Sequence, residues 1–231
     1  MQNKVEHSLN TELLITPAED AVANFVFAHG AGANMHHTFM QQVSELLASL
    51  HVNVIRFNFT YMNKRLEEGK RYPPDRMPKL LAAYQEALKQ LELPSKLNKI
   101  DSTLPLFIGG KSMGSRVAAT LLANEEGQFT TQHIKGLVCL GYPFHPQKKL
   151  EQLRLEPLLA ASKPSLIIQG ERDALGNKQE ILGYNLPQNY KTVFLTDGDH
   201  SFKPRVKSGF SYNQHILTAV DHIVSFINEQ D

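Results

Sequence analysis

The stretch Leu106-Phe107-Ile108-Gly109-Gly110-Lys111-Ser112-Met113-Gly114 says most about how this chain folds. It begins as an apolar run typical of a buried strand, continues into the pattern G-x-S-x-G, and leads into a helix-forming segment. A strand, a sharp turn and a helix in this order would hold the Ser112 hydroxyl clear of a sheet. Gly110 and Gly114 flank the serine because such a turn leaves no room for side chains. The pattern therefore predicts an exposed, nucleophilic serine at the end of a buried strand.

Short apolar runs alternate with helical patterns along the rest of the chain. This alternation favours βαβ units, an α/β fold and a mainly parallel sheet. Several apolar runs are continuous, as expected for strands that helices cover on both faces. The expected strands are Asn24–Ala28, Val52–Phe57, Leu104–Ile108, Gly136–Leu140, Ser165–Gln169 and Lys191–Leu195, and the expected helices are His37–Ser49, Pro78–Leu91, Ser115–Ala123, Leu150–Leu159 and Tyr212–Asn228.

The remaining segments define the expected organisation of the chain. Residues 1–16 are a candidate antiparallel edge strand. Asn63–Pro78 and Tyr142–Lys163 are rich in proline and charge, and we expect loops or short helices there, over the rim of the sheet. The second of these segments is too short to form a large lid over the sheet. No linker or repeat is visible, so we expect one domain over residues 1–231.

Composition and charge exclude several classes of function. The chain carries 24 Lys and Arg against 23 Asp and Glu, a balance that gives no electrostatic reason to expect nucleic acid or an anionic membrane as the main partner. No apolar stretch approaches the roughly 20 residues that span a bilayer. Residues 1–10 are polar and contain no signal-peptide core. The lone Cys139 excludes an internal disulfide and lies in an apolar run typical of the core. We expect a cytoplasmic protein.

A serine hydroxyl is a poor nucleophile near neutral pH, so Ser112 needs a base and a group that orients the base. In enzymes with a serine in this context, an acid and then a histidine follow on loops after later strands. Asp173 directly follows the expected strand Ser165–Gln169, and His200 follows Lys191–Leu195. We therefore predict that His200 takes the Ser112 proton and that Asp173 orients the imidazole and stabilises its charged form.

Other acidic residues are weaker candidates for this role. Glu171 is the main alternative to Asp173. Asp197 and Asp199 are so close to His200 in sequence that they are poorly placed to orient its ring. Their position in a glycine-containing loop favours a role as turn-forming residues.

The remaining histidines do not indicate a metal centre. His215 and His222 fall on the expected terminal helix, where we interpret them as surface or packing residues. His36 and His37 are neighbours in sequence, so their side chains do not readily converge on one ion. We expect no metal site.

A serine nucleophile also needs two backbone N–H groups to stabilise the oxyanion of a tetrahedral intermediate. The Met113 N–H, directly after the nucleophile, is one candidate. The small residues of Phe27–Ala33 form the kind of loop that supplies the second donor. Within this loop we predict Ala31 as the donor, with Gly32 as the alternative, and His29 as a residue that holds the loop. For this loop taken alone, a glycine-rich turn without a catalytic part remains the other interpretation.

Four residues near these parts are predicted to contact a substrate, namely Gly32, Tyr61, Lys111 and Tyr142. Tyr61 and Tyr142 follow strands, and either line the pocket wall or pack at the rim of the sheet. Lys111, together with Arg71 and Arg116, either surrounds an anionic group of the substrate or forms solvated charges and structural salt bridges. The short rim segments predict a shallow, open site suited to small or flexible acyl substrates.

These motifs together resemble those of the α/β-hydrolase superfamily, and within it the branch related to dienelactone hydrolases. The motifs concerned are His29-Gly30-Ala31-Gly32, Gly110-Lys111-Ser112-Met113-Gly114, Gly170-Glu171-Arg172-Asp173 and Asp199-His200. Finer features are similar to a subgroup that includes testis-expressed protein 30 and the third subunit of the NSL histone-acetyltransferase complex. Those features are Arg56-Phe57-Asn58-Phe59-Thr60-Tyr61-Met62, Gly109-Gly110-Lys111-Ser112-Met113-Gly114-Ser115-Arg116 and Gly141-Tyr142-Pro143-Phe144-His145-Pro146. The resemblance implies a mainly parallel sheet of seven or eight strands with helices on both faces, the Ser112, His200 and Asp173 roles given above, and no cofactor.

Two hypotheses for the function follow. Dienelactone hydrolases use a cysteine nucleophile whereas this chain has Ser112, so their substrate is not carried over. The first hypothesis is a serine hydrolase that cleaves an ester, thioester or related acyl bond of a small molecule through an acyl-enzyme. The alternative is a catalytically quiet scaffold of the same fold that binds a protein partner. Because the chain keeps the nucleophile, the base, the acid and both oxyanion segments, we favour the enzyme over the scaffold. A peptidase of the same fold is a minor third option.

Overall fold

A seven-stranded sheet lies at the centre of the computed structural model, which describes residues 11–91, 100–124 and 133–230. Its strands are β1 (Leu13–Thr16), β2 (Ala23–Ala28), β3 (Val52–Phe57), β4 (Leu106–Lys111), β5 (Ile134–Leu140), β6 (Ser165–Gly170) and β7 (Tyr190–Leu195). Across the described residues the strand order is β1-β3-β2-β4-β5-β6-β7. β1 pairs antiparallel with β3, which confirms the predicted edge strand, and the other pairings are parallel. Residues 1–10 of that prediction lie outside the described residues.

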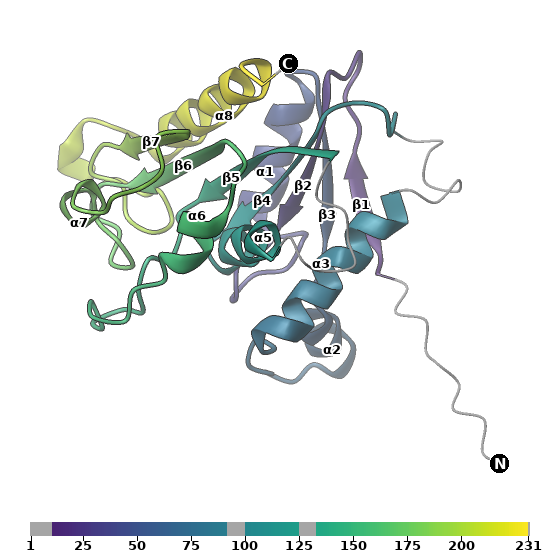
Figure 1. Ribbon diagram of the computed structural model, residues 1–231, viewed down its shortest axis with the longest axis horizontal. Coiled ribbons are helices and arrows are strands. Elements are labelled where there is room, and N and C mark those ends of the chain that lie inside the picture. The colour runs from purple at the N-terminus through teal and green to yellow at the C-terminus, as the bar shows by residue number, and fades with distance from the viewer. Residues whose placement is uncertain (1–10, 92–99, 125–132, 231) are drawn as a thin grey trace.

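Helices cover both faces of the sheet (Figure 1). They are α1 (Thr38–Ala48), α2 (Thr60–Glu68), α3 (Met77–Leu91), α5 (Met113–Ala123), α6 (Glu156–Ala160), α7 (Lys178–Leu182) and α8 (Tyr212–Asn228), with a short 3-10 helix at Val206–Ser208. One cluster of buried apolar side chains includes residues of α1 and α8, and a second includes residues of α3, α5 and α6. The sheet therefore lies between two layers of helices, as predicted.

The strand order reverses at β2, which has β3 on one side and β4 on the other. In open α/β sheets, ligands bind beyond the carboxyl ends of the strands at such a reversal. Near these ends, the register pairs Ala28 of β2 with Gly110 of β4. The loop after β2 and the turn after β4 are therefore neighbours at this edge of the sheet.

The continuous apolar runs form buried strands, as predicted. Every residue of β2, β3 and β6 is buried, because helices cover both faces. The helix α8 has the predicted bounds and begins with a capping box, in which the Ser211 hydroxyl accepts from the Gln214 N–H and the Gln214 side chain accepts from the Ser211 N–H. Its apolar face, which includes Ile216, Val220 and Ile223, is buried.

The predicted helix Leu150–Leu159 is wrong over its first half, because only Glu156–Ala160 is helical. Before this helix the chain folds back on itself, and the Arg154 N–H donates to the Phe144 carbonyl with 2.7 Å between N and O. This long-range hydrogen bond replaces the bond that a helix would make. Residues 141–164, all of them described, contain α6 and no large lid, as predicted.

The strand β4 lies further toward the serine than the predicted Leu104–Ile108. Pro105 has no N–H to donate to a neighbouring strand, so the strand begins at the following residue. It continues to Lys111, the residue directly before Ser112. Ser112 therefore directly follows the carboxyl end of its strand, without an intervening loop.

Candidate active site

Ser112 lies between β4 and α5 in a backbone conformation that few residues adopt. Its φ of 52° and ψ of −114° lie outside the regions that L-residues favour. A Cβ at Gly110 would lie 2.5 Å from the carbonyl carbon of Gly114, and one at Gly114 would lie 2.4 Å from the Ala28 carbonyl oxygen. Close backbone contacts therefore require both glycines, which confirms the prediction of a turn without room for side chains.

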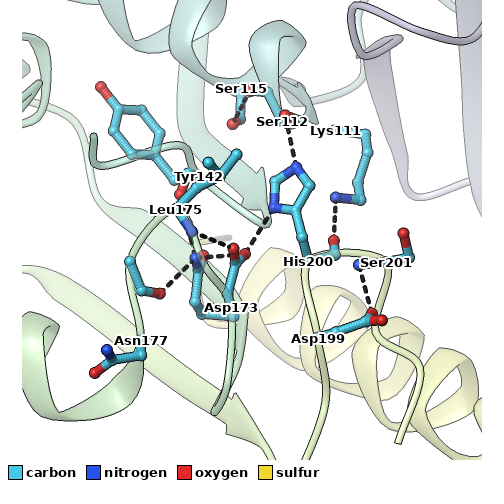
Figure 2. Close-up of polar contacts among 12 residues, drawn as sticks. Lys111, Ser112, Ser115, Tyr142, Asp173, Leu175, Asn177, Asp199, His200 and Ser201 are labelled. Atoms are coloured by element: carbon cyan, nitrogen blue, oxygen red, sulfur yellow. Dashed lines mark hydrogen bonds and ion pairs between the residues drawn. The ribbon is translucent and has the colours of Figure 1, made fainter. Parts of the chain in front are cut away.

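The Ser112, His200 and Asp173 side chains form one hydrogen-bonded chain (Figure 2). The Nε2 atom of His200 lies 2.8 Å from the Ser112 Oγ, and its Nδ1 atom lies 2.7 Å from the Asp173 Oδ2. The Asp173 side chain is fully buried, whereas that of His200 is 30% exposed. The structure thus brings together the three residues predicted as nucleophile, base and acid, with the imidazole between the other two.

Asp173 is held by donors besides His200. Its Oδ1 accepts from the Leu175 N–H and its Oδ2 accepts from the Gln169 amide, with 2.8 Å between nitrogen and oxygen in each hydrogen bond. The Gln169 amide nitrogen also lies 3.2 Å from the Tyr142 carbonyl oxygen. Gln169 is absent from the predicted site residues, although the sequence contained a signal for it. It is a polar residue at the end of an otherwise apolar strand, and a buried polar group needs partners.

The other acidic candidates have different partners. The two carboxylate oxygens of Glu171 accept from the Lys178 ammonium (2.8 Å) and from the Asp197 N–H (2.9 Å), and these hydrogen bonds lower the pKa of Glu171. Asp199 accepts from two backbone N–H groups of its own loop. Hydrogen bonds from Arg205 lower the pKa of Asp197 to about 2. Both aspartates therefore stabilise the loop, as predicted for turn-forming residues.

The loop after β2 lies against the serine, since a Cβ at Gly30 would lie 3.6 Å from the Ser112 Cβ. His29 in this loop is buried, and its Nε2 accepts from the Phe59 N–H over 3.1 Å. Burial lowers the pKa of His29 to about 4, so the ring is neutral and carries its proton on Nδ1. This proton is donated to the Gly30 carbonyl, 2.7 Å away. Because a trans peptide is planar, the bond also orients the Ala31 N–H.

A second pair of donors acts on the same loop. The Ala31 carbonyl accepts from the Tyr61 hydroxyl (3.1 Å) and from the Arg65 guanidinium (3.2 Å). Because the peptide between Ala31 and Gly32 is planar, these two hydrogen bonds also orient the Gly32 N–H, the alternative oxyanion donor. The Met113 N–H belongs to the first turn of α5, where N–H groups have no partner within the helix. The predicted donors therefore lie on segments that neighbouring side chains and the helix hold in place.

A family model described as an alpha/beta hydrolase domain matches residues 21–228. The chain belongs to the alpha/beta hydrolase family. The matched span contains the serine turn, the loop after β2, Asp173 and His200. It confirms the superfamily predicted from the motifs, and the sheet with its two helix layers is the fold of this family.

Solved structures of other hydrolases resemble this one. Dienelactone hydrolase from Anabaena variabilis has a TM-score of 0.69 and 16% identity over 95% of this chain and 92% of that chain. Est1E from Butyrivibrio proteoclasticus with ferulic acid bound has a TM-score of 0.69 and 14% identity over 95% of each chain. A serine hydrolase without a lid from Xanthomonas campestris has a TM-score of 0.65 and 16% identity over 95% of this chain and 88% of that chain. At these identities, the likeness shows the fold.

The Lys111 side chain of this alpha/beta hydrolase reaches the loop that carries His200. Its Nζ donates to the His200 carbonyl over 2.7 Å (Figure 2) and lies 5.2 Å from the centroid of the Phe202 ring. Gly141 leaves the space for this ammonium, since a Cβ there would lie 2.7 Å from Nζ. Burial lowers the pKa of Lys111 to about 8. Lys111 was predicted to contact the substrate, and the structure places its ammonium on a backbone carbonyl.

The other predicted substrate contacts differ in exposure. Gly32 is exposed, and a Cβ there would have no atom within 4 Å among the described residues. Tyr61 is buried beneath the Ala31 carbonyl that it binds. Tyr142 is buried too, and its hydroxyl donates to the Arg154 carbonyl over 2.8 Å. The two tyrosines thus occupy the packing positions that the sequence had left open as the second interpretation.

The remaining predictions concern histidines, metals and the cysteine. His215 is a buried packing residue that donates from Nδ1 to the Phe202 carbonyl, and His37 caps α1 by accepting from the Phe39 N–H. Cys139 is buried in the core, as predicted. In the part of the chain that the structure describes, no three His, Cys, Asp or Glu residues are grouped so that they could hold a metal ion. No helix in that part is long and apolar enough to cross a membrane.

Proposed function

We propose that this alpha/beta hydrolase is a serine hydrolase that cleaves an ester, thioester or related acyl bond of a small molecule. The observation that carries the proposal is the hydrogen-bonded chain from Ser112 through His200 to the buried Asp173. A serine activated in this way is nucleophilic because the imidazole can accept its proton as the new bond forms. The strained backbone at Ser112 supports the same role, since such conformations gather at functional sites.

In the proposed reaction, the Ser112 Oγ attacks the acyl carbonyl carbon while His200 Nε2 takes the hydroxyl proton. The oxyanion of the tetrahedral intermediate accepts hydrogen bonds from the Met113 and Ala31 N–H groups. When the intermediate collapses, the bond to the alcohol or thiol breaks and His200 returns the proton to that leaving group. Water then attacks the acyl-enzyme by the same route and the acid is released. Asp173 stays ionised throughout and stabilises the imidazolium.

Relatives of the same fold support an ester-type substrate for this site. Est1E holds ferulic acid in its solved structure, and a similar structure from Rhodothermus marinus is an esterase domain. We take carboxylesterase-like activity on small acyl substrates as the proposal for this chain. From the motifs at residues 56–62, 109–116 and 141–146, we also infer membership of the subgroup that includes testis-expressed protein 30.

Labelling with a fluorophosphonate probe tests the proposal. The wild-type protein and the Ser112→Ala variant are treated in parallel, and the mass of each intact protein is measured. We expect one adduct on the wild type and none on the variant. In a separate assay of unlabelled protein, only the wild type should hydrolyse short acyl esters. If neither folded protein gained an adduct, the catalytically quiet scaffold would replace the hydrolase as the preferred function.

A further inference from the structure

Two partly buried arginines lack the guanidinium partners that three others have. Arg56, Arg65 and Arg172 each donate from the guanidinium to backbone carbonyls. Arg116 and Arg154 are partly buried as well, yet within residues 11–91, 100–124 and 133–230 neither guanidinium makes a hydrogen bond or an ion pair. Among the described residues, the Nε atoms of Arg116 and Arg56 are both buried without an acceptor, but the two other guanidinium nitrogens of Arg56 are bonded. A buried donor of this kind costs free energy, so an unpaired one calls for an explanation.

Arg116 and Arg154 lie on neighbouring elements of the fold. Burial and then the Arg116 charge lower the pKa of Arg154. Both arginine charges also act on the Tyr142 phenol, whose hydroxyl donates to the Arg154 carbonyl over 2.8 Å. Arg116 is on α5, which packs against α6, and Arg154 directly precedes the residue that caps α6. Two like charges thus lie on packed elements, and no carboxylate of the described residues is bonded to either, an arrangement unfavourable for a purely structural role.

The backbone of Arg116 lies close to the proposed nucleophile. The Arg116 N–H donates to the Ser112 carbonyl over 3.2 Å, which places Arg116 one helical turn, about 5.4 Å along the axis, from the serine. The segment that carries Arg154 starts at the base. It begins with Gly141, where a Cβ would lie 3.5 Å from the His200 Cε1, and continues with Tyr142. Arg116 therefore lies one turn along α5 from the serine, and the Tyr142 hydroxyl ties Arg154 back to the start of the segment that lies beside the imidazole.

We propose that Arg116 and Arg154 together bind an anionic group of the substrate, a carboxylate or a phosphate. Guanidinium groups present parallel N–H donors that match both kinds of oxyanion, and an anion between them would offset their repulsion and satisfy the buried Nε. The inference rests on the proposed function and narrows the substrate class. The substrate is then an acyl ester or thioester that carries a negative charge near the scissile bond.

Two esters of equal chain length test the inference. The first is the mono-4-nitrophenyl ester of adipate, which ends in a carboxylate, and the second is 4-nitrophenyl hexanoate, which ends in a methyl group. We expect the wild type to have the higher kcat/KM for the adipate ester. Because hydrogen bonds to charged groups contribute about 1.5 to 3 kcal/mol, Arg116→Gln and Arg154→Gln should each lower the ratio of the two kcat/KM values by roughly 10- to 100-fold.

Three further variants act as controls for charge and folding. Arg116→Lys keeps the charge but loses the planar fork, so it should lower the ratio less than Arg116→Gln. Arg76→Gln removes an exposed arginine and should leave the ratio unchanged. Thermal unfolding of Arg116→Gln and Arg154→Gln checks the fold, and removal of one of two like charges should leave the unfolding temperature at or above that of the wild type. If Arg116→Gln and Arg154→Gln left the ratio of the two kcat/KM values unchanged, whether or not both values fell, the inference would be overturned.

Failure of the proposed function is distinguishable from failure of this inference. If the wild type hydrolysed neither ester and gained no fluorophosphonate adduct, the hydrolase proposal would fail. The anion site is then tested alone by isothermal titration of the Ser112→Ala protein with adipate and, separately, with glycerol 3-phosphate. Saturable binding that Arg154→Gln abolishes would support the site, and the anion that binds would show whether the site takes a carboxylate or a phosphate. If neither anion bound, the inference would be refuted.

Discussion

The Lys111 ammonium donates a hydrogen bond to the backbone carbonyl of His200, with 2.7 Å between Nζ and the oxygen. Lys111 is the last residue of β4 and directly precedes Ser112, whereas His200 lies 89 positions further along the chain. One side chain therefore links the strand that carries the serine to the loop that carries the imidazole. This link positions His200 from its backbone, while Asp173 positions it from its ring.

Replacement of Lys111 by methionine tests this positioning role. The Lys111→Met variant keeps an apolar stem of similar length beside Phe202 but cannot donate to the His200 carbonyl. Since a small misplacement of a reacting group can cost up to about 100-fold in rate, we expect kcat for a short ester to fall by roughly 10- to 100-fold with little change in KM. Lys191→Met, at an exposed lysine paired with Glu229, is the matched control. If Lys111→Met had the kcat of the wild type, Lys111 would have no role in positioning His200.

The same lysine should make stability depend on pH. Burial lowers the pKa of Lys111 from 10.5 to about 8, so between these values the unfolded chain binds more protons than the folded one. The free energy of unfolding should then rise with pH from about 8 to about 10.5 through this group, and its contribution should be least favourable below pH 8. Urea unfolding of wild type and Lys111→Met across this range measures the effect. Parallel pH profiles of the two proteins would contradict it.

Substitutions at Ser112 should separate activity from backbone strain. Glycine tolerates a φ of 52° better than serine or alanine does, so Ser112→Gly should be more stable than Ser112→Ala by roughly 1 kcal/mol. Both variants should lose hydrolysis, and Ser112→Ala should unfold close to the wild-type temperature. Denaturant unfolding of the three proteins decides the point. Equal stability of the glycine and alanine variants would mean that the turn stores no strain at this residue.

The assignment of the acid is testable by a pair of isosteric changes. Asp173→Asn removes the carboxylate that binds His200 Nδ1, so kcat should fall on the order of 10⁴-fold, as should that of His200→Ala. Glu171→Gln should have little effect on kcat, because that carboxylate binds Lys178 and the Asp197 N–H instead of the imidazole. The comparison needs only ester kinetics for the three variants. A large loss in Glu171→Gln together with an active Asp173→Asn would reverse the assignment.

Much of the fold follows from local patterns, and those parts could be predicted from the sequence. β3 has the predicted bounds because its mainly apolar and β-branched residues, Val52, Val54 and Ile55, are typical of a buried parallel strand. Residues Tyr212–Asn228 form the predicted helix because the repeat of apolar residues and the Ser211 cap are close together in the sequence. The turn at Ser112 belongs to the same group, since Gly110 and Gly114 are its immediate neighbours.

What could not be predicted depends on partners that lie far away in the sequence. Nothing in the charge of Lys111 indicates that its acceptor is the His200 carbonyl. The failure of the helix at Leu150–Leu155 likewise depends on the Phe144 carbonyl, which withdraws the Arg154 N–H from helical bonding. For the candidate site, the reacting side chains were therefore accessible to sequence reasoning, whereas the acceptor of the Lys111 ammonium was not.

The hydrogen bonds around Arg154 also bear on how this hydrolase could diversify. The Phe144 carbonyl accepts from the Arg154 N–H, and the Tyr142 hydroxyl donates to the Arg154 carbonyl. Residues 142–154 therefore form a loop that is closed at its base, while residues 147–153 are exposed. Lengthening such a loop at its tip adds only a small closure entropy and leaves the base where it is. Insertions at residues 147–153 are therefore a route by which evolution could add a cap and change substrate range without rebuilding the turn at Ser112.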